Sequence, residues 1–235
     1  MLNKEPELFV ISAPSGAGKS TLIRELLNEH ENFDLSISAT TRPPRAGEVN
    51  GVHYHFISDD MFSNLIDENE FVEYAQVHNH RYGTLKSHIK NKFEEGKNVI
   101  LDIDVQGFCQ IQQSGIANTS IFILPPSFSE LRERLNRRKS DSKSAIEKRL
   151  QNAKKEVAHF KKYDFVIIND DIDNALTALK DVFFLNLAVC RFHCRLSRHL
   201  YLVVSYLSFG VSYSRSIVQW LVLLLVVEHA LGLCV

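Results

Sequence analysis

Short apolar runs alternate with amphipathic stretches along most of the chain. The first run, residues 8–12, ends at Pro14 and two glycines, which predicts a buried parallel strand that enters a tight loop. Apolar side chains then recur at helical spacing while charged ones lie elsewhere, which predicts an amphipathic helix over 19–29. The opening pattern is therefore strand, glycine loop and helix.

Three later runs have the same character. Residues 98–105 include acidic positions near their end, residues 120–124 stop at two prolines, and residues 164–168 are followed by Asn-Asp-Asp. Buried strands that alternate with helical patterns are typical of a parallel sheet covered by helices on both faces. We therefore expect an α/β fold.

Two long segments interrupt this alternation. The polar segment 35–96 contains Arg42-Pro-Pro-Arg45 and several aromatic side chains, and we interpret it as an inserted lobe. The segment 127–162 is highly charged, with helical spacing on either side of residues 140–144. Its charge alone favours a solvated helical hairpin.

The last segment, 187–235, differs in composition. Lysine is absent after Lys180, and Glu228 is the only acid after Asp181. Residues 217–227 are almost wholly apolar, but they number fewer than the roughly 20 that a spanning helix needs. The segment could be a buried helix, a weak membrane anchor, or an altered C-terminus that replaced the original sequence, and we favour the last.

Composition narrows the classes of partner. The chain has 235 residues, of which 45% are hydrophobic, and its net charge of -1 gives no reason to expect nucleic acid. Four cysteines are too few and too unevenly placed for a disulfide framework. Residues 1–7 lack the basic region and long apolar segment of a signal peptide. We expect a cytoplasmic protein and no membrane partner, although the tail leaves a membrane partner open. A homo-oligomer is compatible with the sequence.

Residues 13–20, Ala-Pro-Ser-Gly-Ala-Gly-Lys-Ser, match the phosphate-loop pattern, except that alanine stands at the usual first glycine. Gly16 and Gly18 allow backbone N–H groups to turn inward around phosphate oxygens, and the following helix adds its positive end. Lys19 can reach the β- and γ-phosphates of ATP, and the Ser20 hydroxyl can ligate Mg²⁺. The predicted ATP-binding residues of this segment are Ala13, Pro14, Ser15, Gly16, Ala17, Gly18, Lys19, Ser20 and Thr21.

Further motifs follow along the chain. In order of sequence they are residues 38–51 with Tyr54, Phe71-Val-Glu73, Tyr82-Gly-Thr84, Leu101-Asp-Ile-Asp104 and Ile168-Asn-Asp-Asp171. With the phosphate loop, they closely resemble guanylate kinase in its bacterial form, over about residues 7–186. The resemblance implies transfer of the γ-phosphate of ATP to GMP, and also to dGMP, in purine nucleotide metabolism.

The resemblance also implies a P-loop NTPase three-layer fold and a domain layout. A guanylate-kinase-like domain, 1–186, would contain a core made of 7–34, 97–126 and 163–186. A GMP-binding lobe would span 35–96 and a helical lid 127–162, with 187–235 as the atypical tail.

For the acceptor phosphate, the resemblance implies that Arg42 and Arg45 act as a stiff fork around two prolines, because guanidinium geometry matches phosphate oxygens. Hydroxyl groups of Tyr54 and Tyr82 would add donors. The same GMP-binding set includes Glu48, Gly83 and Asp102.

Guanine presents N1–H and N2–H donors on one edge, so a site that selects it over adenine needs a carboxylate acceptor. Glu73 is the family match for that role, while Ser38, Thr84 and Asp104 match other contacts to the base. Thr84 keeps the hydroxyl of the serine that is usual in the family. Asp102 and Asp104 are expected to close a strand; one could hold Mg²⁺ through water or orient an arginine, and the sequence does not say which.

In the charged segment, the resemblance implies a mobile lid that brings Arg134, Arg138 and Arg149 over the ATP phosphates. Phosphoryl transfer rests on in-line positioning and on cations that meet developing charge, so no general base is needed. The implied catalytic residues are Lys19, Arg42, Arg138 and Arg149.

Three alternatives remain at this stage. A P-loop kinase for another acceptor is disfavoured by Glu73 with Ser38, and a scaffold module that binds peptides is disfavoured by the intact Gly-Lys-Ser sequence. A kinase inactivated by its tail is the third. We predict that removing residues 190–235 leaves GMP kinase activity intact or improves soluble yield, and loss of activity in a folded truncation would contradict this.

Overall fold

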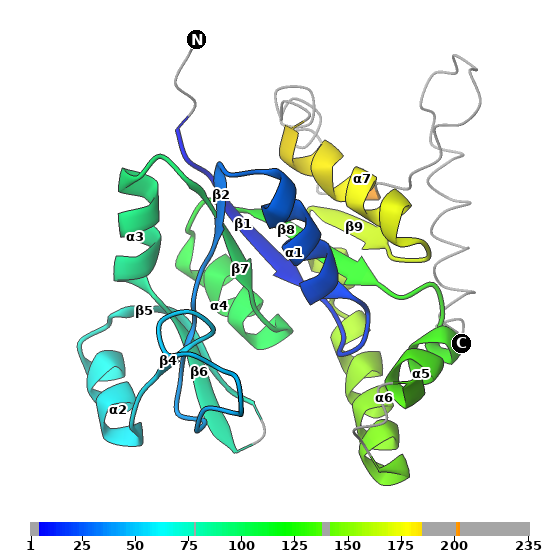
Figure 1. Ribbon diagram of the computed structural model, residues 1–235, viewed down its shortest axis with the longest axis horizontal. Coiled ribbons are helices and arrows are strands. Elements are labelled where there is room, and N and C mark those ends of the chain that lie inside the picture. Colours follow the sequence, from blue (N-terminus) through cyan, green and yellow to red (C-terminus); the bar gives the residue numbers. More distant parts are fainter. Residues whose placement is uncertain (1–4, 78, 138–141, 185–200, 203–235) are drawn as a thin grey trace. The chain divides into compact units, whose positions relative to one another are not determined.

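The computed structural model describes residues 5–77, 79–137, 142–184 and 201–202. The chain divides into two compact units (Figure 1). Among the described residues, the first unit comprises those between 5 and 12 and between 27 and 120, and the second comprises those between 13 and 26 and from 121 onward.

The first unit contains a parallel ladder of three strands. β1 (Leu8–Ser12) pairs with β7 (Asn98–Asp102), and β7 pairs with β2 (Phe33–Leu35). Every side chain of β1 is buried, as expected for a parallel strand covered on both faces. α4 (Val105–Ser114) packs against β1, and α3 (Lys86–Glu94) packs against β7.

A second sheet, with strand order β4-β3-β6-β5, lies within the predicted lobe 35–96. Its strands are β3 (Ala39–Thr40), β4 (His55–Phe56), β5 (Phe71–Val77) and β6 (His80–Leu85). β5 and β6 pair antiparallel with Glu73 opposite Thr84. α2 (Asp59–Asp67), capped by Ser58, contributes Phe62 to a small core with Ala39 and Phe71.

The expected strand over 98–105 is wrong at its end. β7 stops at Asp102, and Asp104 instead caps α4, where its Oδ1 accepts a hydrogen bond from the Gly107 N–H at 2.9 Å. Aspartate is a strong N-cap because its carboxylate satisfies an otherwise unpaired N–H of the first turn. Val105 is therefore the first residue of a helix, and the two aspartates do not close one strand.

The second unit carries the other strands. β9 (Phe165–Ile168) pairs parallel with β8 (Thr119–Leu124) on one side and with β10 (Tyr201–Leu202) on the other. The first two residues of β8 belong to the first unit. α1 (Lys19–Glu29) begins at the predicted residue, and its first eight residues lie in this unit. α7 (Ile172–Phe184) packs against β9.

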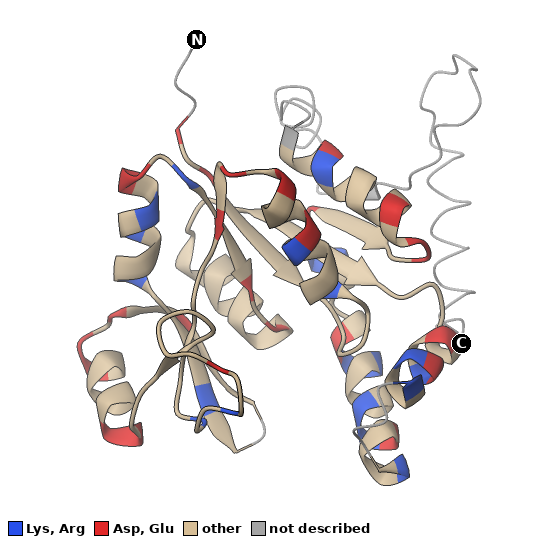
Figure 2. Ribbon diagram, viewed as in Figure 1, with Lys and Arg blue, Asp and Glu red and all other residues tan. Residues whose placement is uncertain are grey.

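Two helices of the second unit carry the charged segment 127–162, as its spacing predicted. They are α5 (Phe128–Arg137) and α6 (Lys143–Val157), and a short 3-10 helix, η1 (Phe160–Lys162), follows. Leu131, Leu135, Ile146 and Leu150 form a buried core between α5 and α6, while basic positions recur along both helices (Figure 2). Both helices are therefore amphipathic, with a buried apolar contact between them and charged residues on their outer faces.

Apart from β10, the predictions for residues 187–235 fall outside the described residues. Among the helices that the structure describes, none combines the length and apolarity that a bilayer span requires.

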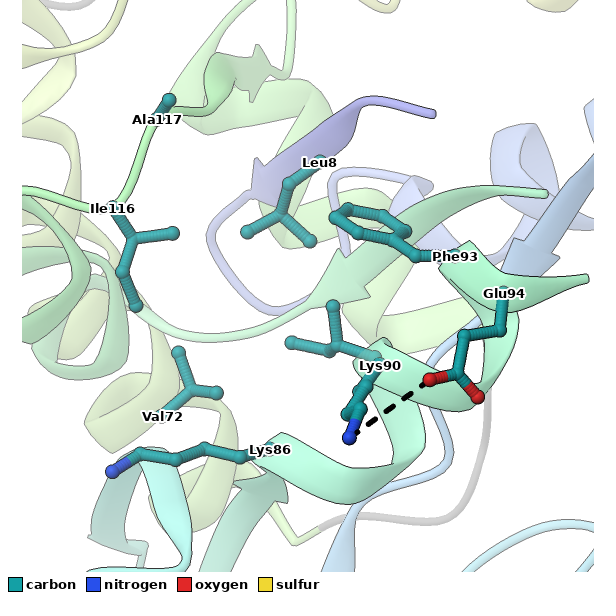
Figure 3. A pocket seen from close by; sticks show the side chains of 9 residues that line it. Leu8, Val72, Lys86, Lys90, Phe93, Glu94, Ile116 and Ala117 are labelled. Atoms are coloured by element: carbon teal, nitrogen blue, oxygen red, sulfur yellow. Dashed lines mark ion pairs between the residues drawn. The ribbon is translucent and has the colours of Figure 1, made fainter. Parts of the chain in front are cut away.

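A hollow of about 470 Å³ lies in the first unit (Figure 3). Leu8, Val72 and Phe93 contribute to its apolar lining, and an ion pair of 3.9 Å joins Lys90 and Glu94 beside it. None of the predicted site residues lines this hollow, so it is not the predicted nucleotide site.

Candidate functional site

The predicted phosphate loop leads directly into α1. Gly16 and Gly18 have φ values of 97° and 96°, a region that side chains strongly disfavour. The Ala17 N–H donates to the Pro14 carbonyl at 3.0 Å, and the N–H groups of Thr21 and Leu22 both donate to the Gly18 carbonyl. The chain thus turns sharply at both glycines before the helix begins.

Side chains of α5 pack closely against the loop at Gly16. An added β-carbon at Gly16 would lie 3.0 Å from methyl carbons of both Leu131 and Leu135. These leucines are fully buried and belong to the core shared by α5 and α6. The helix that carries the predicted lid residue Arg134 therefore also packs against the loop.

Asn169 is a second support, and it lies in the turn after β9. Its side chain is 5% exposed, and its Nδ2 donates to the Ala17 carbonyl at 2.7 Å. A β-carbon at Gly18 would lie 2.2 Å from the same Nδ2, so this glycine is required for space as well as for its positive φ.

Two of the predicted lid arginines contact this part of the structure. Arg134 Nη2 donates to the Asn169 carbonyl at 2.9 Å, and its Nε donates to Glu130 at 2.9 Å. Arg149 Nη1 donates to the Ser15 hydroxyl at 3.3 Å. Arg138, which the sequence predicts to act beside them, lies outside the described residues.

In the first unit, Arg42 is the centre of a compact turn. Its side chain is 8% exposed, and both terminal nitrogens donate to Glu48, at 2.9 and 2.8 Å. Glu48 Oε2 also accepts from the backbone N–H of Arg45 at 2.7 Å. The carboxylate therefore holds the guanidinium and closes the proline-containing turn at the same time.

The electrostatics of this turn follow from the ion pair. The hydrogen bond to Glu48 is the largest influence that raises the pKa of Arg42, and the same pair lowers the pKa of Glu48 to about 2. Both groups consequently remain charged at any physiological pH.

Aromatic rings surround the guanidinium. Its central carbon lies 5.3 Å from the ring centroid of Tyr54 and 5.7 Å from that of Phe56. The rings of Tyr54 and Tyr82 are 6.0 Å apart, and burial followed by the charge of Asp102 raises the pKa of the Tyr54 hydroxyl. Three of the residues predicted for the acceptor phosphate, Arg42, Tyr54 and Tyr82, are thus brought together, whereas Arg45 is exposed.

Glu73 is a buried carboxylate, with 4% of the residue exposed. Its Oε1 accepts a hydrogen bond of 2.6 Å from the Thr84 hydroxyl, which the β5–β6 register places directly opposite. Burial is the largest influence on its pKa and raises it; the bond from Thr84 opposes this and the charge of Asp104 adds to it, so that the pKa reaches about 7.

The remaining predicted residues have simpler surroundings. Ser38 lies before β3, where its carbonyl accepts from the His55 N–H at 2.9 Å. Gly83 lies in β6 against the ring of Phe71. Lys19 and Ser20 occupy the first two positions of α1, where the Ser20 side chain faces solvent. Ala13 is half-buried at the start of the loop.

Sequence reasoning missed two residues of these sites. Asn169 was quoted only as part of a motif, although a polar residue that follows a buried parallel strand lies at the edge where ligands of α/β folds bind. Gly107 was not singled out, and a glycine in the first turn of a predicted helix was the available signal.

Comparisons with known proteins agree with this geometry. The guanylate kinase family model matches residues 5–185. The guanylate kinase of Pseudoalteromonas translucida (strain TAC 125) is 48% identical over 182 residues, which cover 77% of this chain and 88% of the relative. That of Vibrio vulnificus (strain YJ016) is 49% identical over 177 residues, 74% of this chain and 86% of the relative.

A solved structure gives the same result. The crystal structure of guanylate kinase from Anaplasma phagocytophilum superposes with a TM-score of 0.62 at 30% identity, and the match covers 79% of this chain and 88% of the other. The predicted α/β fold class, with a parallel sheet and a separate small sheet, is thereby confirmed. The family match ends before the predicted tail begins at residue 187.

Proposed function

Because this chain belongs to the guanylate kinase family and phosphorylates GMP with ATP, we propose that its two groups of side chains serve the two nucleotides. The loop in the second unit binds ATP, and the turn at Arg42 with the buried Glu73 binds GMP. The described residues of each group lie within one unit, so each assignment rests on local contacts.

On the donor side, backbone N–H groups of residues 15–19 surround the β- and γ-phosphates of ATP. Lys19 neutralises charge on the transferring group, and Arg134 and Arg149 approach the loop from α5 and α6. Support for this comes from the contacts of the two arginines with Asn169 and Ser15. Positioned cations suffice for catalysis, since the transfer needs no protein nucleophile.

The loop also fits a magnesium ion bound with ATP. Mg²⁺ retains several waters and takes few protein ligands beside phosphate oxygens, and the exposed Ser20 hydroxyl in the first turn of α1 provides one hard oxygen of that kind. Bound there, the ion would neutralise phosphate charge and orient the phosphates. We assign no other protein ligand to it.

On the acceptor side, Arg42 binds the GMP phosphate with help from Arg45 and from the hydroxyls of Tyr54 and Tyr82. Because Glu48 already bonds both terminal nitrogens of Arg42, we propose that Glu48 positions the arginine and does not itself bind GMP. A preformed guanidinium needs little ordering when the phosphate arrives.

Guanine selection is assigned to Glu73, and the observation that carries it is a buried carboxylate with one oxygen held by Thr84. Its remaining lone pairs can accept from N1–H and N2–H of guanine, which adenine cannot offer. Ser38 and Asp104 complete the base side of the site. The same chemistry admits dGMP, because none of these groups requires a ribose 2′-hydroxyl.

A coupled assay of ADP formation tests the proposal. GMP and dGMP are expected to be used well, whereas AMP, CMP and UMP should be used poorly at equal concentration. AMP used as well as GMP would contradict the role of Glu73. Roles of Asp102, a homo-oligomer and a cytoplasmic location stay predictions.

Replacing Asn169 by alanine is expected to raise KM for ATP about tenfold and to lower the free energy of unfolding by about 1–2 kcal/mol, because the buried Ala17 carbonyl loses a short hydrogen bond. KM for GMP should stay within about twofold. Steady-state kinetics with each nucleotide varied in turn measures both constants. Asn136→Ala, at an exposed position of α5, is the matched control, and equal effects on the two KM values would contradict the assignment.

Guanine binding is expected to release a proton near pH 6. With its pKa at about 7, Glu73 of the unliganded protein is largely protonated there, and accepting two N–H bonds requires the ionised form. Affinity for the base should therefore rise about tenfold between pH 6 and pH 8. Calorimetry in buffers of different ionisation enthalpy counts the proton.

Guanosine is the ligand of choice for this measurement, because it lacks the phosphate of GMP, whose own pKa lies near 6. A Glu73→Gln protein is the control, and its binding of guanosine should release no proton. Equal proton release from both proteins would rule out Glu73 as the titrating group.

A further inference from the structure

Gly107 lies in the first turn of α4, and its backbone does not require glycine. It is not among the glycines with positive φ, and glycine inside a helix is less favourable than alanine by roughly 0.5–1 kcal/mol. The reason for a glycine at this position must therefore be space.

The space is occupied by Glu73. A β-carbon on Gly107 would lie 2.3 Å from Glu73 Oε2, 3.0 Å from its Cδ and 3.4 Å from its Cγ. The carboxylate thus lies where the side chain of any other residue would begin.

Neither side of this contact can move without losing other bonds. The Gly107 N–H is held by Asp104 Oδ1 at 2.9 Å, and the Phe108 N–H donates to the Asp104 carbonyl at 3.0 Å. Glu73 is buried and bonded to Thr84 at 2.6 Å. Because the overlap is with the end of a side chain and the helix backbone is fixed by its cap, an alanine at position 107 would displace the Glu73 carboxylate more readily than the helix.

We propose that Gly107 is a positioning residue for nucleobase specificity: the missing side chain lets the Glu73 carboxylate rest against the first turn of α4, where it meets the guanine edge. Asp104 contributes by capping that turn and fixing the Gly107 backbone. The inference rests on the proposed role of Glu73.

The test is a double-mutant cycle of Gly107→Ala and Glu73→Ala, read as KM and kcat for GMP. Gly107→Ala alone should raise KM for GMP about 10- to 100-fold, since small displacements of positioning groups have effects of this size. Its kcat at saturating GMP and its KM for ATP should change less than about threefold. In the Glu73→Ala background, Gly107→Ala should add nothing, because the group it displaces is gone.

Thermal unfolding of the same proteins is the second readout. Gly107→Ala should lower the midpoint, and adding Glu73→Ala should restore it by removing the overlap, so a poorly folded single variant still leaves the cycle readable. Gln113→Ala, at an exposed position of the same helix, controls for substitution in α4 and should behave as the unaltered protein.

The outcomes separate the two assignments. Glu73→Ala without effect on KM for GMP would overturn the role of Glu73, and the inference about Gly107 with it. Glu73→Ala with the expected effect, but with Gly107→Ala harmless or fully additive to it, would overturn the inference about Gly107 alone.

Discussion

Replacing Lys19 by alanine is expected to lower kcat about 1,000-fold at saturating ATP and GMP, which corresponds to about 4 kcal/mol of transition-state stabilisation. In the transition state, negative charge spreads over the oxygens of the transferring phosphoryl group, and a fixed cation beside these oxygens stabilises it most at that stage. The first position of α1 holds the backbone of Lys19 beside the loop, so no other side chain of that turn can replace it.

A matched variant distinguishes this effect from a general loss of positive charge. Arg24→Ala removes a cation from the same helix, where the Arg24 side chain is 66% exposed and paired with Glu25, and should leave kcat within about twofold, as exposed pairs contribute little. Circular dichroism confirms that both variants are folded. A Lys19→Ala protein that kept more than a tenth of the original kcat would contradict the assignment.

Glu73→Gln is expected to have two opposite effects. Catalysis should suffer, with kcat/KM for GMP falling about 100-fold, because an amide replaces a charged acceptor and can present a donor to the N–H groups of guanine. KM for ATP should change less than about twofold, and the preference for GMP over AMP should shrink by a similar factor of about 100.

Stability of the unliganded protein should rise in the same variant. Glu73 has a pKa of about 7 when folded and an ordinary value of 4.5. Between these values the folded chain binds more protons than the unfolded one, so stability declines as the pH rises from 4.5 through 7. Glutamine has no such loss, and the variant should be more stable by up to about 3 kcal/mol above pH 7.

Denaturant unfolding at pH 8 and at pH 4.5 measures this difference, which should be present at the higher pH and almost absent at the lower one. Glu68→Gln, which changes an exposed acid at the end of α2, provides the control for removal of one negative charge. A gap of equal size at both pH values would show that burial of the Glu73 charge is not its cause.

The parts of the fold that sequence predicted well are those where local signals agree. β1 and α1 were found because an apolar run, two glycines and an amphipathic repeat follow one another within residues 8–29. The boundary at Asp104 was missed because Ile103 and Val105 continue the apolar pattern of β7. An aspartate three residues before Gly107 was a capping signal that hydrophobicity concealed.

Contacts between distant segments could not be read in this way. Arg42 and Glu48 are visibly near each other in the sequence. The bidentate ion pair between them, however, depends on how the two prolines turn the chain. The overlap of Gly107 with Glu73 joins a helix to a strand 34 residues earlier. No local pattern encodes such a distance, and only the packing of α4 against β5 reveals it.

The hydrogen bond from Asn169 to the Ala17 carbonyl also bears on biosynthesis. The nucleotide-binding motif leaves the ribosome early, but the amide that braces it is among the last parts of the catalytic domain to be made. A nascent chain therefore carries the whole motif for most of its translation without the support that shapes it. The ability to bind ATP should thus arise late in synthesis, once β9 and the Asn169 that follows it have packed into the fold.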